Sequence, residues 1–345
     1  MATFLYNENS SVTNEICDCE NDRIIQIPGC FKTVRGRYGD NIFFGRKHCL
    51  KYLEMENGVE TFGEGVFKDC RTLEHINFSN TVKRIEKNAF SFCKFKNLEL
   101  PNSLEYIGSG AFTGNNMTSV RIPPNVKYVG QGAFSFCSQL KVIKIYGKTD
   151  GWDTSWNEAG VNEVGVFKKL VPYYHTNIID LSEAYKDYTV GMNYYNSSDF
   201  TRAVQYLSRA AKEGVDEACF YLAECYQSGK GTAQDINQAI FWLEKIVNVS
   251  SFKPEVSKLR LSYYYSMLND TQSKNKAINL LNQLLQTMLT QQNDGYTGLT
   301  EDISDIYYLI GTTYRDLSNT PKYREYITLS ARLGNSDAKA ELARM

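Results

Sequence analysis

The chain has 345 residues, of which 42% are hydrophobic and 22% are charged. This length is sufficient for two domains, and the composition is that of a folded chain rather than a disordered one. Lysine and arginine together (38) nearly equal aspartate and glutamate together (39), so the formal net charge of −1 provides no electrostatic basis for binding nucleic acid or an anionic membrane.

The compartment is predicted from three further features of the sequence. No apolar run approaches the roughly 18 residues that a membrane span needs, so we expect no membrane insertion. The first residues show neither a basic start nor an apolar stretch of signal-peptide length. Nine cysteines, an odd number in a chain too long to need disulfide staples, favour a reducing compartment. Together these features predict a cytoplasmic protein.

The start of the chain is irregular. Residues 1–20 match no pattern and form an unassigned N-terminal segment. We expect residues 21–52 to form either a degenerate first coil of the repeats that follow or an N-terminal cap on them. The apolar segment 50–55 is an early copy of their strand pattern, with Phe44 as its anchor.

Residues 53–147 repeat a unit of 22 or 23 residues. Each copy has a phenylalanine anchor preceded by a small residue and followed by an alternating apolar segment. The anchors are Phe67, Phe90, Phe112 and Phe134, and the segments span 73–78, 95–100, 117–122 and 140–145. Each segment predicts a short strand, and stacking of successive coils buries apolar faces that one coil cannot bury alone. Gly63, Gly108 and Gly130, four residues before their anchors, predict tight corners.

Segments such as 126–145, VKYVGQGAFSFCSQLKVIKI, resemble the BspA-type leucine-rich repeat. The resemblance covers about 95 residues and implies a strand-rich solenoid over residues 21–147. Residues 148–180 carry no repeat, and we interpret them as a cap and linker rather than as a separate binding site. Trp152, Val166 and Phe167 are candidates for the lid on the last coil.

From residue 181 to residue 345 the apolar period becomes helical. Ala203, Ala239 and Ala277 each lie in an i, i+3, i+4 apolar frame, residues 323–334 are its last copy, and a partner helix precedes each of the four frames. Each partner helix carries a small residue and, one turn later, a tyrosine. The small residues are Gly191, Ala223, Ser262 and Gly311, and the tyrosines are Tyr194, Tyr226, Tyr265 and Tyr314. The pattern predicts helix–turn–helix pairs stacked side by side.

The second pair, over residues 218–243, resembles the Sel1-like repeat, a relative of the tetratricopeptide repeat. Gly229 and Gly231 are expected to end one helix and turn the chain, and Asp235 to cap the next helix. The later pairs have longer connections, including an irregular one over 286–301. The fold class is thus α+β by halves: a strand-rich leucine-rich-repeat solenoid followed by an all-α solenoid.

The sequence shows no recognisable catalytic, cofactor or metal site, and we predict a protein that is not an enzyme. Gly229 and Gly231 lack the third glycine and the preceding strand of a phosphate loop. Cys17, Cys19 and Cys30 lack the fourth ligand and spacing of a zinc site, so they are interpreted as free thiols. His48, His75 and His175 are scattered, without a repeated relation to a nucleophile.

Four equivalent positions lie three residues after the anchors. Cys70, Cys93 and Cys137 are interpreted as small buried hydrophobes, and Asn115 as a buried amide that bonds to turn backbone. Stacked coils lie roughly 4.8 Å apart, so a Cys70–Cys93 disulfide is an alternative that geometry permits.

The remaining candidates for function are two surface strips that bind protein or peptide partners. One strip consists of outward strand residues and their neighbours, and the other of residues beside the close-packed positions of the first helices. They comprise Glu54, His75, Asn77, Asn97, Glu99, Ser119, Arg121 and Lys144 in the first strip, and Tyr221, Glu224, Tyr264, Tyr308 and Thr312 in the second. For each residue, plain solvation or core packing is the alternative.

The leading hypothesis is therefore a non-enzymatic scaffold or adaptor without cofactor. The resemblance to BspA-type repeats implies an alternative: an exported or surface-displayed protein that mediates adhesion or host-cell interaction. An enzyme with a site in 148–180 is a third hypothesis, and it would need a pocket with convergent polar groups. The pattern makes no prediction of partner identity or oligomeric state.

Overall fold

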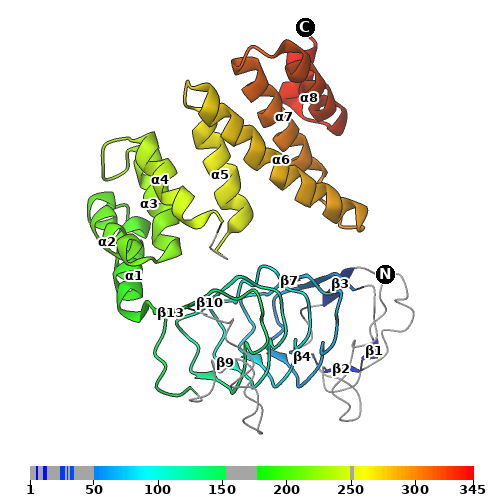
Figure 1. Ribbon diagram of the computed structural model, residues 1–345, viewed down its shortest axis with the longest axis vertical. Helices are drawn as coiled ribbons and strands as arrows, with labels where there is room; N and C mark the ends of the chain where they lie inside the picture. Colours follow the sequence, from blue (N-terminus) through cyan, green and yellow to red (C-terminus); the bar gives the residue numbers. More distant parts are fainter. Residues whose placement is uncertain are drawn as a thin grey trace. The chain divides into compact units, whose positions relative to one another are not determined.

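The repeats predicted for residues 53–147 form stacked coils in the computed structural model (Figure 1). The structure describes residues 5–6, 11–13, 24–27, 29, 32–34, 50–152, 177–248 and 252–345. The chain divides into two compact units, residues 1–185 and residues 186–345. The first unit is strand-rich and the second is helical, which confirms the predicted fold class.

In the first unit, the described strands form three sheets. The largest sheet has the order β1 (Leu5–Tyr6), β2 (Ser11–Thr13), β4 (Thr33–Val34), β6 (Thr61–Phe62), β8 (Arg84–Ile85), β9 (Tyr106–Ile107) and β11 (Tyr128–Val129). The other sheets are β3 (Ile24–Ile27), β5 (Tyr52–Met55) and β7 (His75–Asn77), and β10 (Ser119–Ile122), β12 (Val142–Ile145) and β13 (Asn177–Asp180). Apart from the antiparallel β1–β2 pair, the pairings are parallel.

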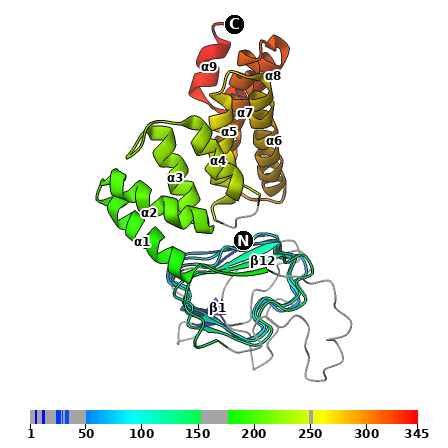
Figure 2. The ribbon, with the colours of Figure 1, turned by 60° about the vertical axis from the view of Figure 1, so that its left-hand side comes forward.

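Successive coils superpose, as Figure 2 shows in a view nearly along the stack. The anchor rings form a continuous stack: the ring centroids of Phe67 and Phe90 lie 5.4 Å apart, those of Phe90 and Phe112 5.8 Å, and those of Phe112 and Phe134 5.7 Å. All four rings are buried. Such offset stacks add about 0.5–1.5 kcal/mol per pair to the burial itself, so the anchors stabilise each coil against its neighbours.

Backbone hydrogen bonds join the anchor segments, and in each of them the donor N–H belongs to one coil and the acceptor carbonyl to the next coil along the chain. The N–H groups of Phe67, Phe90 and Phe112 donate to the carbonyls of Ala89, Ala111 and Ala133, at 2.8–2.9 Å. The N–H groups two residues before and after each of these anchors donate to the following coil in the same way. We name this set of bonds the inter-coil ladder.

The coil corners depend on two backbone features. Each coil has left-handed residues two positions before and two positions after its anchor: Gly65, Asn88, Gly110 and Gly132, and Asp69, Phe92, Gly114 and Phe136, with φ between 55° and 72°. Two of the three predicted glycines, Gly108 and Gly130, serve close approach instead. A Cβ on Gly108 would lie 2.4 Å from the backbone nitrogen of Lys87, and one on Gly130 would lie 2.5 Å from that of Ser109.

The buried positions after the anchors agree with the sequence pattern, with one difference. Phe95, Leu98 and Leu100 are buried as expected, but residues 95–100 form no strand, so the prediction of a strand there is wrong. The sheet on this side is therefore interrupted between β7 and β10. Apolar alternation determines which side chains turn inward, whereas a strand also needs ladder hydrogen bonds to a neighbouring strand.

The segment after the last coil contains a strand that the sequence did not indicate. β13 pairs in parallel with β12, with Ile178 opposite Ile143, and so adds a further rung to the sheet. The Leu181 N–H donates to Ile145 O at 2.7 Å. Trp152 is buried and its Nε1–H donates to Val126 O at 3.3 Å, as suits a lid residue. Val166 and Phe167, the other lid candidates, lie outside the described residues.

The helical half consists of antiparallel pairs followed by a short helix. The pairs are α1 (Ser182–Asn196) with α2 (Phe200–Glu213), α3 (Asp216–Ser228) with α4 (Ile236–Ile246), α5 (Pro254–Ser266) with α6 (Thr271–Asn293), and α7 (Thr300–Asp316) with α8 (Thr320–Leu333). The short helix is α9 (Ser336–Leu342). Helix α6 extends through Asn293, so the expected irregular connection over 286–301 is wrong in its first half.

Close packing and caps fix these pairs as the sequence predicted. Gly191, Ala223, Ser262 and Gly311 are all buried. Asp235 caps α4 by accepting a hydrogen bond from the Gln238 N–H at 3.0 Å. Gly229 ends α3 in the left-handed conformation, and a Cβ on Gly231 would lie 2.1 Å from Phe200 O. The turn between α3 and α4 is therefore a structural feature and not a phosphate loop.

Candidate functional site

A group of polar and aromatic side chains joins the first helices of three successive pairs. We name it the tyrosine–carboxylate cluster: Tyr188 and Tyr195 on α1, Tyr221 and Glu224 on α3, and Arg260 on α5. The Tyr195 hydroxyl donates to Glu224 Oε1 at 2.8 Å, and the Arg260 guanidinium donates to Glu224 Oε2 at 2.7 Å. The Tyr221 ring centroid lies 5.5 Å from that of Tyr195 and 6.4 Å from that of Tyr188.

Each member of the cluster keeps part of its surface open to solvent. The side chains of Arg260 and Glu224 are 33% and 26% exposed, and the three tyrosines are half-buried. Ion pairs of this exposure contribute roughly 0–1 kcal/mol to stability. The cluster therefore matters less for stability than for holding aromatic and charged groups in a fixed arrangement at the surface.

Electrostatics within the cluster fix the charge of Glu224. Burial alone would raise the pKa of this carboxyl, but the hydrogen bonds from Arg260 and Tyr195 outweigh burial and lower it. Burial raises the pKa of Tyr195 above its usual range, and the hydrogen bond to Glu224 raises it further. At neutral pH the cluster thus holds an ionised carboxylate between a neutral phenol and a guanidinium.

Two cations lie beside the aromatic rings at the edge of the cluster. The Arg260 guanidinium carbon lies 4.3 Å from the Phe220 ring centroid. The Lys253 ammonium lies 5.3 Å from that centroid and 5.9 Å from the Tyr221 ring. Cation–π contacts of this kind contribute about 0.5–1 kcal/mol at exposed sites, so they help to orient both cations.

The cluster contains part of the predicted helical strip. Tyr221 and Glu224 lie in it, as described above. Tyr264 is only 4% exposed, so the expectation that it faces a groove is wrong. Tyr264 is a buried residue of α5, and its burial raises the pKa of its phenol. Sequence reasoning missed Tyr188, Tyr195 and Arg260. The contacts of Tyr195 and Arg260 with Glu224 span 29 and 36 residues.

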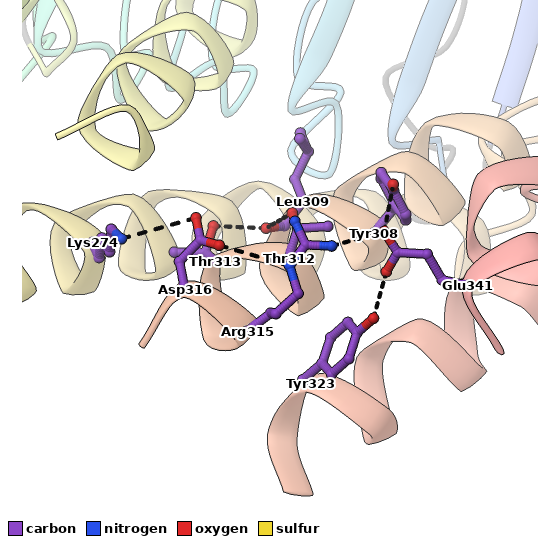
Figure 3. Close-up of polar contacts among 9 residues, drawn as sticks. All are labelled: Lys274, Tyr308, Leu309, Thr312, Thr313, Arg315, Asp316, Tyr323 and Glu341. Atoms are coloured by element: carbon purple, nitrogen blue, oxygen red, sulfur yellow. Dashed lines mark hydrogen bonds and ion pairs between the residues drawn. The ribbon is translucent and has the colours of Figure 1, made fainter. Parts of the chain in front are cut away.

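The other two residues of that strip, Tyr308 and Thr312, belong to a separate group at the last pair (Figure 3). Glu341 on α9 accepts hydrogen bonds from Tyr308 (3.2 Å), Tyr323 (2.7 Å) and Arg315 (2.9 Å). We name these four residues the α9 anchor. The Thr312 hydroxyl donates to Leu309 O of its own helix. Helix α9, which sequence analysis did not predict, thus uses Tyr308 for packing.

The predicted strip of the first unit is exposed only in part. Asn77, Asn97 and Glu99 are exposed, whereas Glu54, His75, Ser119 and Lys144 are half-buried. The His75 ring stacks on Tyr52, with centroids 4.8 Å apart and planes 8° apart. Backbone pairing places Glu54 opposite Asn77 and Arg121 opposite Lys144.

Arg121 is the exception in this strip. It is only 6% exposed, so the expectation that it faces solvent is wrong. Both terminal guanidinium nitrogens donate to Asn102 Oδ1 at 3.2 Å, and the guanidinium lies 4.7 Å from the Tyr146 ring centroid. The Tyr146 ring covers Arg121, although the alternation of side chains along the strand alone would expose this residue to solvent.

The positions three residues after the anchors behave as interpreted from the sequence. Cys70, Cys93 and Cys137 are buried free thiols. Cys93 and Cys137 donate to the anchor carbonyls of the preceding coils, Phe67 O and Phe112 O, both at 3.3 Å. Asn115 donates to Phe90 O and to Phe112 O at 2.9 Å and accepts from the Phe95 N–H at 3.2 Å.

Several sequence predictions fall on residues that the structure does not describe. They concern Phe44, His48, His175 and the thiols Cys17, Cys19 and Cys30. Within the described ranges, no group of three or more His, Cys, Asp or Glu residues could hold a metal ion. No helix in that part of the chain is both long and apolar enough to cross a membrane.

Comparison with known proteins bears on both units. The model of the BspA type leucine rich repeat region matches residues 38–155 in six copies, and the model of the Sel1 repeat matches residues 188–215 and 216–247. A search of the curated proteins found no match.

Three solved structures illustrate the similarity. A leucine-rich repeat protein from Bacteroides ovatus is 23% identical, with 41% of this chain and 45% of that chain covered and a TM-score of 0.33. A leucine rich cell surface protein from Faecalibacterium prausnitzii is 19% identical, with 43% of this chain and 47% of that chain covered and a TM-score of 0.32. A Sel1 repeat protein from Oxalobacter formigenes is 22% identical, with 47% of this chain and 62% of that chain covered and a TM-score of 0.30. The chain spans less than two thirds of the length of each.

The two units define a repeat protein that combines stacked coils with stacked helical pairs. Residues 38–155 are BspA-type leucine-rich repeats, and residues 188–247 are Sel1 repeats, so both resemblances seen in the sequence are confirmed. Repeats of both kinds are typical of protein-interaction scaffolds, and they are generally not catalytic.

Proposed function

We propose that this protein is a non-enzymatic scaffold or adaptor that binds a segment of a partner protein on the face formed by α1, α3 and α5. The observation that carries the proposal is the tyrosine–carboxylate cluster, in which half-exposed tyrosines and an ordered ion pair from three successive helices lie together.

The residue types in the cluster support recognition. Tyrosine and arginine are enriched among the residues that dominate binding energy, because each buries a large area and retains a polar end. Glu224 already holds Tyr195 and Arg260 in place. Less conformational entropy is therefore lost when a partner binds, which favours affinity.

The experiment is selection of a random-sequence peptide library on the immobilised full-length protein, followed by affinity measurements on the enriched peptides. Tyr221→Ala and Arg260→Ala are expected to weaken binding at least about tenfold, since truncating a dominant contact costs roughly 2 kcal/mol or more. Tyr263→Ala is the matched control, because Tyr263 is a more exposed tyrosine, at 47%, on the same helix as Arg260.

Two results would contradict the proposal. One is the absence of any enriched peptide. The other is enriched peptides whose affinity is unchanged in both cluster variants, or reduced equally by the Tyr263 variant.

A further inference from the structure

We infer that the first unit binds a compact, neutral, polyhydroxylated ligand of the saccharide class in a cavity at one corner of two adjacent coils. The cavity has a volume of about 410 Å³. It is lined by two consecutive segments, Met55–Asn57 and Asn77–Asn80. These segments begin at the last residues of β5 and β7, which are paired in parallel.

The hydrogen-bonding groups of the cavity are open for a ligand. Three asparagines line it, Asn57, Asn77 and Asn80, and all three are exposed. Within the described part of the chain, none of their side-chain amides has a hydrogen-bond partner. Each amide offers both a carbonyl acceptor and N–H donors, which suits hydroxyl groups that donate and accept at once.

Glu56 adds an acceptor with a fixed orientation. The Gly29 N–H donates to its Oε2 at 3.0 Å, which leaves Oε1 for a ligand hydroxyl. Phe78 supplies the apolar wall. Its ring meets Phe62 and Phe90 edge-on, at centroid distances of 5.7 and 5.8 Å, and the core thereby holds it in place.

The backbone around the cavity is held by hydroxyl groups. Thr81 Oγ1 accepts from the Gly58 N–H at 2.9 Å, donates to Val59 O at 2.8 Å and lies 2.8 Å from Ser79 Oγ. These bonds join the two coils that form the site. A site built before its ligand arrives loses less entropy on binding.

The residues that line the cavity disfavour other classes of ligand. Within the described residues, no lysine, arginine or histidine lines the cavity, while Glu56 does, so phosphate, sulfate and carboxylate ligands are disfavoured. Amide and carboxylate groups dominate the lining, which disfavours a lipid. The site spans only two coils, and adjacent strands lie about 4.8 Å apart, so it suits a compact ligand better than an extended peptide.

The test is saturation-transfer NMR on the full chain with methyl glycosides of D-glucose, D-galactose and D-mannose, and with D-glucuronate as the anionic comparison. We expect transfer to at least one neutral glycoside and at least fivefold less to D-glucuronate. Asn77→Ala and Asn80→Ala should each reduce the transfer at least fivefold. Asn97→Ala is the matched control, an exposed asparagine outside the cavity.

The exposed asparagines are chosen because their removal leaves the core intact, and circular dichroism of each variant confirms folding. Three results would overturn the inference. They are no transfer to any of the three neutral glycosides, transfer that persists in both cavity variants or falls equally in Asn97→Ala, and transfer to D-glucuronate as strong as to the neutral sugars.

Discussion

At the scale of single residues, the position three residues after each anchor shows how one role is filled by different chemistry. Cys93, Asn115 and Cys137 each donate to the anchor carbonyl of the preceding coil. A thiol makes one weak bond there, whereas the amide of Asn115 makes three bonds, one of which satisfies the backbone N–H of Phe95. Removing such a buried group leaves its partners without bonds, at a cost of about 1–3 kcal/mol.

We therefore predict that Asn115→Ala lowers the free energy of unfolding of the first unit by about 1–3 kcal/mol, because it leaves the Phe90 carbonyl and the Phe95 N–H unsatisfied. Urea unfolding followed by tryptophan fluorescence measures the change. Asn97→Ala, at an exposed position, is the control and should change stability by less than about 0.5 kcal/mol. Equal effects of the two substitutions would contradict the role given to Asn115.

The buried thiols make a second prediction, on pH. Burial raises the pKa of Cys137 to about 12, because a thiolate would lose its hydration. The folded-state pKa lies above the unfolded value of about 9, so the neutral thiol contributes stability below pH 9 that is lost as the pH rises toward 12.

Since the thiolate is the reactive form, Cys137 should resist iodoacetamide at pH 9 in the folded chain and react readily in urea. Peptide mapping by mass spectrometry identifies the modified cysteine in each condition. Modification of Cys137 at the same rate with and without urea would contradict its burial.

At the scale of elements, α9 shows how a short helix is held to the array. Its seven residues are too few for a stable isolated helix. The α9 anchor ties it to α7 and α8 through one carboxylate (Figure 3). Burial alone would raise the pKa of Glu341, but the hydrogen bond from Tyr323 and the charge of Arg315 outweigh it and lower that pKa.

Glu341→Ala should consequently release α9 while leaving α7 and α8 folded. We expect the backbone amides of α9 to exchange with deuterium at least about tenfold faster, which corresponds to about 1.4 kcal/mol of local stability. Hydrogen-exchange mass spectrometry makes the measurement. Glu325→Ala, which removes an exposed pair with Lys322, should leave α9 unchanged; faster exchange in that variant too would argue against a specific anchor.

At the scale of the whole molecule, the sequence predicted both arrays because their apolar periods are local and repeated. The anchors, the small residues at helix contacts and the cap Asp235 were all identifiable from spacing. What spacing did not reveal depends on distant partners. Arg121 is buried by Tyr146, 25 residues later, and Arg260 joins the cluster through a contact 36 residues away. Strand β13 has four residues and lies outside the repeats, so it can be recognised only from its pairing with β12.

Because each array is stabilised by contacts between neighbours, we predict that fragments 1–181 and 182–345 both fold when expressed separately. This boundary keeps β13 with its sheet and α1 intact. Circular dichroism should show a strand-rich spectrum for the first fragment and a helical one for the second, each with cooperative thermal unfolding. An unstructured fragment 182–345 would show that the helical pairs depend on the coils.

The inter-coil ladder also bears on how such a chain can change in length. The donors of one coil, on Gly65, Phe67 and Asp69, face carbonyls of Lys87, Ala89 and Ser91. If residues 87–108 were lost, the same donors would meet the carbonyls of Ser109, Ala111 and Thr113, which already serve as acceptors. Evolution can thus shorten or lengthen the molecule by complete periods, because the backbone donors of one coil fit the carbonyls of any other coil that keeps the pattern.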